Sequence, residues 1–265
     1  MIKKIRCWIQ ISAAFFLLDC YCFGVVPKIS IITSVYKSDA FIRGFLEDIV
    51  QQTIFNQCEL ILINAASPGN EAKVIREFMV RYPNIIYKKL KKDPGLYGVW
   101  NIAIKMAQGE YLTNANTDDR LKFDCYEKHT QMLDQHPEID LVYSENYVTY
   151  VPNETFEKHT MSRVYGLAEF SRQAMRGCLP SNHPMWRKTF HQKYGYFDST
   201  FKIYGDYEMW LRAVDKGSMF KKVPGVYGIY YFNPNGLSTK RDRQRRRQKN
   251  TERKRILKKY QHIWQ

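Results

Sequence analysis

The first half of the chain alternates between short apolar runs and longer segments with helical spacing. The runs have the length of strands and are rich in Ile, Val and Leu, over residues 28–36, 59–63, 84–90 and 110–114. Between them lie three segments whose apolar residues recur every three or four positions, over residues 40–52, 71–81 and 97–108. Because these segments follow one another with short connections, the pattern predicts an α/β fold with a doubly wound, mostly parallel sheet flanked by helices.

Sheets of this kind bind ligands beyond the carboxyl ends of their strands. Three polar segments are predicted to lie at this edge, over residues 33–39, 64–70 and 114–120. None of them contains the glycine-rich sequence of a P-loop or of a dinucleotide-binding turn. P-loop nucleotide hydrolases and ordinary dinucleotide dehydrogenases are therefore excluded.

The segment after the fourth predicted strand carries two adjacent carboxylates, Asp118 and Asp119, among amide side chains. Neighbouring carboxylates repel each other unless a cation lies between them. An oxygen-rich site without thiols or imidazoles suits Mg²⁺ or Mn²⁺, and such an ion can neutralise a diphosphate leaving group. A solvated turn is the alternative interpretation, because Asn, Thr and Asp are common turn residues.

Composition and charge distinguish the body of the chain from its two ends. The 265 residues are 45% hydrophobic, and 41 Lys and Arg against 26 Asp and Glu give a formal net charge of +15. Residues 240–265 hold twelve Lys and Arg against only Asp242 and Glu252, and residues 1–26 add a further local charge of +2. The body is therefore nearly neutral, which argues against a domain that wraps nucleic acid and predicts a basic C-terminal helical tail.

Residues 1–26 form a hydrophobic leader, in which a basic start precedes an apolar stretch from Cys7 to Leu18. This stretch is too short to span a bilayer, and it fits a signal peptide, a membrane-interface anchor or an over-long start of the reading frame. The six cysteines of the chain form no C-x-x-C pair. Their spacing argues against zinc and redox centres and favours a reducing compartment.

Several motifs follow one another in order across the body. They are the strand at residues 29–36, Gln52-Thr53 after the first helix, Gly95 and Asn101 before AQGEYL at 107–112, NTDD at 116–119, GYFD at 195–198 and GDYEMWLR at 205–212. In this order and spacing they resemble the family 2 glycosyltransferases of GT-A fold, over residues 27–238.

The resemblance implies a single GT-A-type domain over residues 27–239, with a nucleotide-sugar half (27–120) and an acceptor half (121–239). It implies transfer of a sugar from a UDP-linked donor to an acceptor hydroxyl with inversion, dependent on Mg²⁺ or Mn²⁺, in the synthesis of cell-surface polysaccharide or glycoconjugate. The acceptor would be a saccharide or a lipid-linked molecule. The protein would lie in the cytoplasm at the inner face of the membrane, or be exported if the leader is a signal peptide.

The resemblance also assigns site residues. Asp206 matches the catalytic base, and Asp118 and Asp119 match the metal contacts. The donor-binding positions are Thr33, Ser34, Tyr36, Asn64, Asn101, Asn116 and Asp118, and the acceptor-side candidates are His183, Trp186 and Glu208. The sequence departs from the family at Asn64, Asn116 and Gly205, where acidic residues are usual.

Alternatives remain for single residues and for the whole protein. Asp206 also suits a helix cap, and His183 and Trp186 also suit structural roles. The three departures from the family leave open a catalytically inactive relative that only binds. The basic tail leaves open binding to acidic lipid or to nucleic acid. Nucleic acid is disfavoured, because the basic residues are confined to one predicted helix without interleaved aromatics before Tyr260.

Overall fold

The computed structural model describes residues 26–160 and 163–264, so that the leader expected at 1–26 lies outside them except for its last residue. Within the described residues, nine strands form one sheet in the order β3-β2-β1-β4-β8-β6-β9-β5, with β7 paired to β6. The strands are β1 Ile29–Val35, β2 Cys58–Asn64, β3 Ile85–Lys89, β4 Tyr111–Asn114, β5 Arg120–Leu121, β6 Leu141–Thr149, β7 Val164–Tyr165, β8 Met185–Arg187 and β9 Phe220–Tyr231. The α-helices are α1 Ile42–Val50, α2 Glu71–Arg81, α3 Leu96–Met106, α4 Cys125–Gln135, α5 Phe190–Tyr194, α6 Gly205–Asp215 and α7 Arg243–Tyr260.

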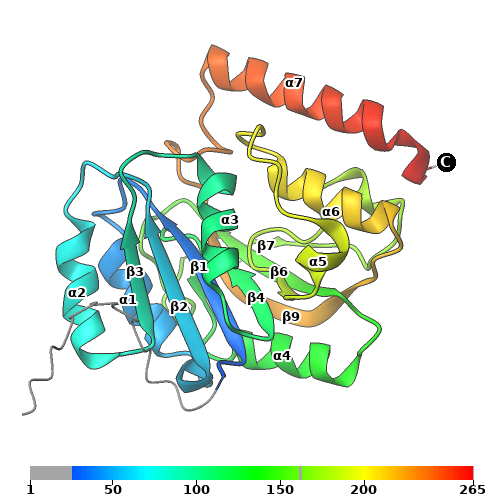
Figure 1. The fold of residues 1–265 in the computed structure, drawn as a ribbon. Helices are drawn as coiled ribbons and strands as arrows, with labels where there is room; N and C mark the ends of the chain where they lie inside the picture. Colours follow the sequence, from blue (N-terminus) through cyan, green and yellow to red (C-terminus); the bar gives the residue numbers. More distant parts are fainter. Residues whose placement is uncertain (1–25, 161–162, 265) are drawn as a thin grey trace, which may run out of the picture.

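The first four strands are parallel, as the alternation of apolar runs and helical segments predicts. Their bounds and those of α1, α2 and α3 differ from the predicted ones by at most two residues. The second half is mixed, because β8 runs antiparallel between β4 and β6. The predicted α/β fold class is confirmed: a single sheet is flanked by helices and followed by a basic C-terminal helix (Figure 1), although the sheet as a whole is mixed and only its first half is entirely parallel.

The central strands β1 and β2 are buried on both faces, which explains why they read as continuous apolar runs. Alternate side chains of these strands point to two hydrophobic layers. Ile31 and Leu62 belong to the layer that contains Phe45 of α1 and Tyr126 of α4. Ile32 and Ile61 belong to the layer of α3 and α6, which contains Trp100 and Trp210.

The C-terminal helix α7 packs across α6 on the outside of the molecule (Figure 1). Its buried residues are Glu252, Ile256 and Tyr260, and the two apolar ones join the layer of α3 and α6. The basic tail is therefore part of the folded domain. Over residues 26–160 and 163–264, no helix combines the length and the apolar character needed to cross a membrane.

Candidate functional site

The carboxyl ends of β2, β1 and β4 lie side by side, at Asn64, Val35 and Asn114. Directly after β1 and β2 the backbone takes a left-handed conformation at two non-glycine residues, with φ of 52° at Lys37 and 55° at Ala66. Such conformations cost on the order of 1–3 kcal/mol each and cluster at binding sites. Two of the three predicted ligand-binding loops thus contain backbone strain.

A buried carboxylate that the sequence analysis missed ties these two loops together. Glu71, the first residue of α2, accepts hydrogen bonds from Ser38 N at 2.8 Å and from Ser67 Oγ at 2.6 Å. Ser67 N in turn donates to Asn64 Oδ1 at 2.8 Å. Although burial opposes ionisation, the bonds from Ser67 and Ser38 hold the pKa of Glu71 below its usual value. The loops after β1 and β2 are therefore fixed before any ligand binds.

The donor-binding candidates on these strands differ in how they are placed. Thr33 and Asn64 are buried, and the side-chain oxygen of Asn64 is already used within its own loop. Ser34 is half-buried, and Tyr36 is 45% exposed at the end of β1. Of the four, Tyr36 presents the largest side-chain surface at this edge.

The two aspartates of the loop after β4 differ in burial and in their hydrogen-bond partners. Asp119 is buried and accepts hydrogen bonds from Asn116 Nδ2 at 2.9 Å, Asn182 Nδ2 at 3.3 Å and Tyr231 N at 3.0 Å. Burial and the charge of Asp118 raise the pKa of Asp119 to about 8. Asp118 is half-buried, and its Oδ2 accepts a hydrogen bond from Asn233 at 2.9 Å. No hydrogen bond from another described residue reaches Oδ1 of Asp118.

The buried side chain of Arg120 fixes the backbone of this loop by hydrogen bonds. Its Nη1 donates to Thr117 O at 2.9 Å and to Asp119 O at 2.7 Å, the carbonyls on either side of Asp118. Its Nη2 donates to Asn153 Oδ1 at 2.7 Å. The guanidinium passes so close to Gly44 that a Cβ there would lie 2.7 Å from Nη2. Burial lowers the pKa of Arg120, and the neighbouring carboxylates oppose that shift.

The donor set of this loop fits a divalent ion only if a ligand completes the coordination. Within the described part of the chain, no three His, Cys, Asp or Glu side chains gather into a metal site. Asp118 offers one oxygen that no other described residue bonds, whereas both oxygens of Asp119 accept N–H groups. Mg²⁺ is commonly held by one or two carboxylates together with substrate phosphates and water. The loop therefore suits an ion that arrives with a diphosphate.

Asp206 lies at the amino end of α6, beside the first turn of α3. Its Oδ1 accepts a hydrogen bond from Tyr207 N at 2.8 Å and lies 3.1 Å from the hydroxyl of Tyr97. No hydrogen bond from another described residue reaches Oδ2. Burial raises the pKa of Asp206, and the bonds from Tyr207 and Tyr97 oppose the shift. Because α3 begins where the chain returns from the carboxyl end of β3, Asp206 lies at the same edge of the sheet as Asp118.

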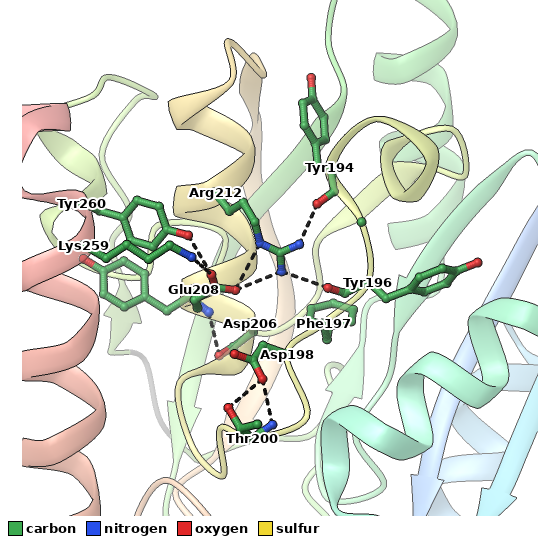
Figure 2. Close-up of polar contacts among 12 residues, drawn as sticks. Tyr194, Tyr196, Phe197, Asp198, Thr200, Asp206, Glu208, Arg212, Lys259 and Tyr260 are labelled. Atoms are coloured by element: carbon green, nitrogen blue, oxygen red, sulfur yellow. Dashed lines mark hydrogen bonds and ion pairs between the residues drawn. The ribbon is translucent and has the colours of Figure 1, made fainter.

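Two other site candidates, Glu208 and Asn101, make their hydrogen bonds within the protein. Glu208 is 3% exposed and accepts hydrogen bonds from Arg212, Lys259 and Tyr260 (Figure 2). Asn101 donates to Phe197 O at 2.8 Å and accepts from Phe197 N at 3.0 Å, so it joins α3 to the loop before α6. The structure gives both side chains structural partners and no free polar group toward a substrate.

Trp186 and His183 are also buried, which argues against the acceptor contacts expected for them. Trp186 is fully buried in β8, and its Nε1 bonds to Nε2 of His191 at 3.0 Å. His183 is 4% exposed, and burial lowers its pKa to about 3, so its ring is neutral. The resemblance to the family predicted where these two residues lie along the chain. It did not predict that their side chains point into the protein.

Comparison with known proteins bears on the family and the fold of this chain. A sequence profile of the family described as Glycosyl transferase family 2 matches residues 30–197, more than half of the chain. The chain is 31% identical over 115 residues to the minor teichoic acid biosynthesis protein GgaB of Bacillus subtilis (strain 168), which covers 43% of this chain and 13% of GgaB. It is 27% identical over 212 residues to the uncharacterized glycosyltransferase YwdF of the same organism, covering 79% of this chain and 76% of YwdF.

A solved structure shares the fold. Residues 1–349 of S. aureus TarS in complex with UDP superpose with a TM-score of 0.64 and 17% sequence identity, over 78% of this chain and 61% of the TarS fragment. The chain thus matches only a small part of GgaB and about three fifths of that fragment.

Proposed function

The chain belongs to glycosyl transferase family 2, and on that premise we propose that it transfers a sugar from a UDP-linked donor to an acceptor hydroxyl with inversion. Relatedness to a teichoic acid biosynthesis protein supports a role in cell-surface polysaccharide or glycoconjugate synthesis. The observation that carries the proposal is the placement of two carboxylates at one edge of the sheet. Asp118 and Asp206 each keep one oxygen there that accepts no hydrogen bond from the other described residues.

The donor diphosphate would lie against the loops after β1, β2 and β4. Besides Asp118, the candidates that remain partly exposed along this edge are Tyr36, Ser34 and Asn116. Mg²⁺ or Mn²⁺ held by Asp118 and the diphosphate would neutralise charge on the leaving group. Asp119 would act indirectly, because its hydrogen bonds to Asn116, Asn182 and the backbone of Tyr231 join three segments around Asp118.

Asp206 would be the general base. Its free Oδ2 would take the proton of the acceptor hydroxyl as that oxygen attacks the anomeric carbon on the face opposite the diphosphate. The new carbon–oxygen bond forms while the bond to the diphosphate breaks, UDP leaves with the electron pair, and the configuration inverts. A pKa raised by burial makes the Asp206 carboxylate a stronger base than an exposed one, and Tyr97 orients the group.

The surface of α7 supports a membrane-bound acceptor. Arg243, Arg247, Lys254 and Lys258 are exposed and lie on the side opposite Glu252 and Ile256. A cation close to an anionic lipid surface contributes roughly 1 kcal/mol. We therefore propose that this stripe of four cations holds the enzyme against acidic lipid, where a lipid-linked acceptor would be found.

Vesicle sedimentation tests the stripe. The full chain should bind vesicles that contain phosphatidylglycerol and release them at high salt, and it should not bind pure phosphatidylcholine. The fourfold change R243Q/R247Q/K254Q/K258Q should abolish the binding. Tighter binding to duplex DNA than to the acidic vesicles would favour the nucleic-acid alternative instead.

The enzyme function is tested with a panel of nucleotide-sugars and Mn²⁺ or Mg²⁺, by measuring UDP release and sugar transfer to saccharide and lipid-linked acceptors. Metal-dependent turnover of a UDP-sugar, with inversion of the anomeric configuration, is the expected result. Binding of UDP-sugars without turnover would identify a catalytically inactive relative. A retained anomeric configuration would contradict the role given to Asp206.

A further inference from the structure

The acidic residue Glu252 lies in the middle of the basic helix α7, and only 4% of its surface is exposed. Its Oε1 accepts a hydrogen bond from Lys202 N at 2.7 Å, and its Oε2 accepts from Ile203 N at 3.0 Å and Tyr204 N at 2.9 Å. Gln248, one turn earlier on α7, donates to Oε1 at 2.6 Å. A buried carboxylate with four N–H donors is firmly held, because each bond is charge-assisted.

The three backbone donors belong to the segment that leads into α6. Tyr204 is the N-cap residue of α6, and its side chain makes no capping hydrogen bond. The N–H groups at the start of a helix have no partner within the helix and need an outside acceptor. Glu252 binds the N–H groups just before the first turn from a helix that follows much later in the chain. Asp206 is the second residue of that turn.

Further contacts attach α7 to both sides of Asp206. Before α6, Arg255 pairs with Asp198 at 2.8 Å. Within α6, Glu208 pairs with Lys259 at 3.0 Å and accepts the hydroxyl of Tyr260 at 2.6 Å (Figure 2). These contacts confine the position of α6 relative to α7, and Glu252 is the residue of α7 that binds the backbone immediately before Asp206.

We propose that Glu252 is a positioning residue for Asp206, because it fixes the backbone of residues 202–204 and thereby sets where the Asp206 carboxylate meets the acceptor hydroxyl. The inference rests on the proposed function of Asp206 as the base. It makes α7 part of the catalytic apparatus, in addition to any role of its basic surface.

Glu252 also acts on Asp206 through its charge. Burial is the main reason that the pKa of Asp206 is raised, and the negative charge of Glu252 adds to the shift. The other ionisable groups that interact with Asp206 are Tyr97 of α3, Cys178 and Tyr204. Tyrosine and cysteine side chains are ordinarily neutral at neutral pH, so among these neighbours Glu252 is the one whose charge acts on Asp206. Removal of the Glu252 charge should therefore lower the pKa of Asp206.

The variants Glu252→Gln and Glu252→Asp separate position from charge. In Glu252→Gln one oxygen becomes an NH₂ group that cannot accept from the backbone, so we expect kcat to fall about 10- to 100-fold. Donor binding should stay unchanged, and the acidic limb of the pH–rate profile should move to lower pH. Glu252→Asp keeps the charge on a shorter side chain, so the limb should stay near its original pH while kcat stays low. Asp242→Asn is the control, because Asp242 caps only α7 and Asn caps equally well.

Titration of the Asp206 carboxyl by ¹³C NMR gives a second readout that needs no substrate. A lower Asp206 pKa in Glu252→Gln than in the unaltered protein supports the inference even if no nucleotide-sugar is turned over, in which case only the proposed function fails. An unchanged Asp206 titration, or a kcat equal to that of the unaltered enzyme, would overturn it. If Glu252→Gln does not fold, Glu252→Asp decides the question: normal kcat would show that the position of the carboxylate does not matter.

Discussion

Asp118 and Asp206 each lie in a segment whose backbone is held by a buried charged side chain. The two supporting side chains differ in the sign of their charge. The Asp118 loop rests on Arg120, which donates to the carbonyls of Thr117 and Asp119. The Asp206 turn rests on Glu252, which accepts from the N–H groups of residues 202–204. The difference follows from the backbone: a loop that exposes carbonyls needs a cation, whereas the start of a helix exposes N–H groups and needs an anion.

The two supports also differ in where they come from along the chain. Arg120 directly follows the loop that it holds, and Asp119 is bonded by Asn116, only three residues earlier. Glu252 is 49 residues from Ile203. The donor side is therefore held by residues of its own loop together with Asn182 and the Tyr231 backbone from the second half of the chain, whereas the base depends on the C-terminal helix. Changes on one side should leave the other side intact, and the predictions below test this independence.

The largest effect is expected for Asp206→Asn. The amide keeps the size and the capping ability of the carboxylate but cannot take a proton, so transfer should fall by about 10²- to 10⁴-fold. Binding of UDP with Mn²⁺ should be unchanged, because the donor side is untouched. Asp215→Asn, at the other end of α6, is the matched control and should transfer normally. Near-normal transfer by Asp206→Asn would mean that Asp206 only stabilises the first turn of α6 by accepting from Tyr207 N.

Asp118→Asn should act on the opposite side. The change alters the one carboxylate of the loop that keeps an oxygen without a hydrogen bond from the described residues, so Mn²⁺-dependent affinity for UDP should fall by about 100-fold or more, beyond the loss typical of an outer-shell residue. The ¹³C titration of Asp206 should not move. Calorimetry with UDP and Mn²⁺ checks the first expectation, and Glu110→Gln, before the amino end of β4, is the control. Unchanged metal dependence would place the ion elsewhere.

The sequence motifs predict the carboxylates of Asp118 and Asp206, but they do not predict the buried side chains that fix the backbone around them. The pattern of apolar residues predicted the parallel half of the sheet. Strands β1 and β2 are buried on both faces and therefore appear in the sequence as continuous apolar runs. The supports Arg120 and Glu252 bind mainly backbone groups, and Glu71 binds the backbone of Ser38; a backbone partner leaves no residue pattern in the sequence. Glu252 had one signal, as one of two acidic residues among twelve basic ones in residues 240–265. Both acids bind N–H groups at or just before the start of a helix.

Arg120→Gln should separate support of the loop from general stability. Loss of the guanidinium leaves the carbonyls of Thr117, Asp119 and Phe41 and the side chain of Asn153 without their donor, so the free energy of unfolding should fall by about 2–3 kcal/mol in urea titrations. Affinity for UDP with Mn²⁺ should fall as well. Arg187→Gln is a matched control, because Arg187 donates to the carbonyls of Leu133, His136 and Ile139 away from the site. It should lose similar stability and keep UDP affinity; equal losses of affinity in both variants would show that Arg120 has no local role.

The smallest effect is expected for Tyr97→Phe, which removes a hydroxyl from the side of Asp206 that faces α3. The hydroxyl lies 2.7 Å from Ile203 O and 3.1 Å from Asp206 Oδ1, and its single proton serves one acceptor at a time. A hydrogen bond to the ionised carboxylate lowers its pKa, so the change should raise the pKa of Asp206. One bond of this kind is worth about 0.5–1.5 kcal/mol, which corresponds to a shift of roughly 0.4–1 pH unit. The acidic limb of the pH–rate profile should therefore move to higher pH, opposite to the shift expected for Glu252→Gln, with only a several-fold change in kcat at high pH. If the acidic limb does not move, Tyr97 donates to Ile203 O alone and does not affect the pKa of Asp206, whereas Glu252 does.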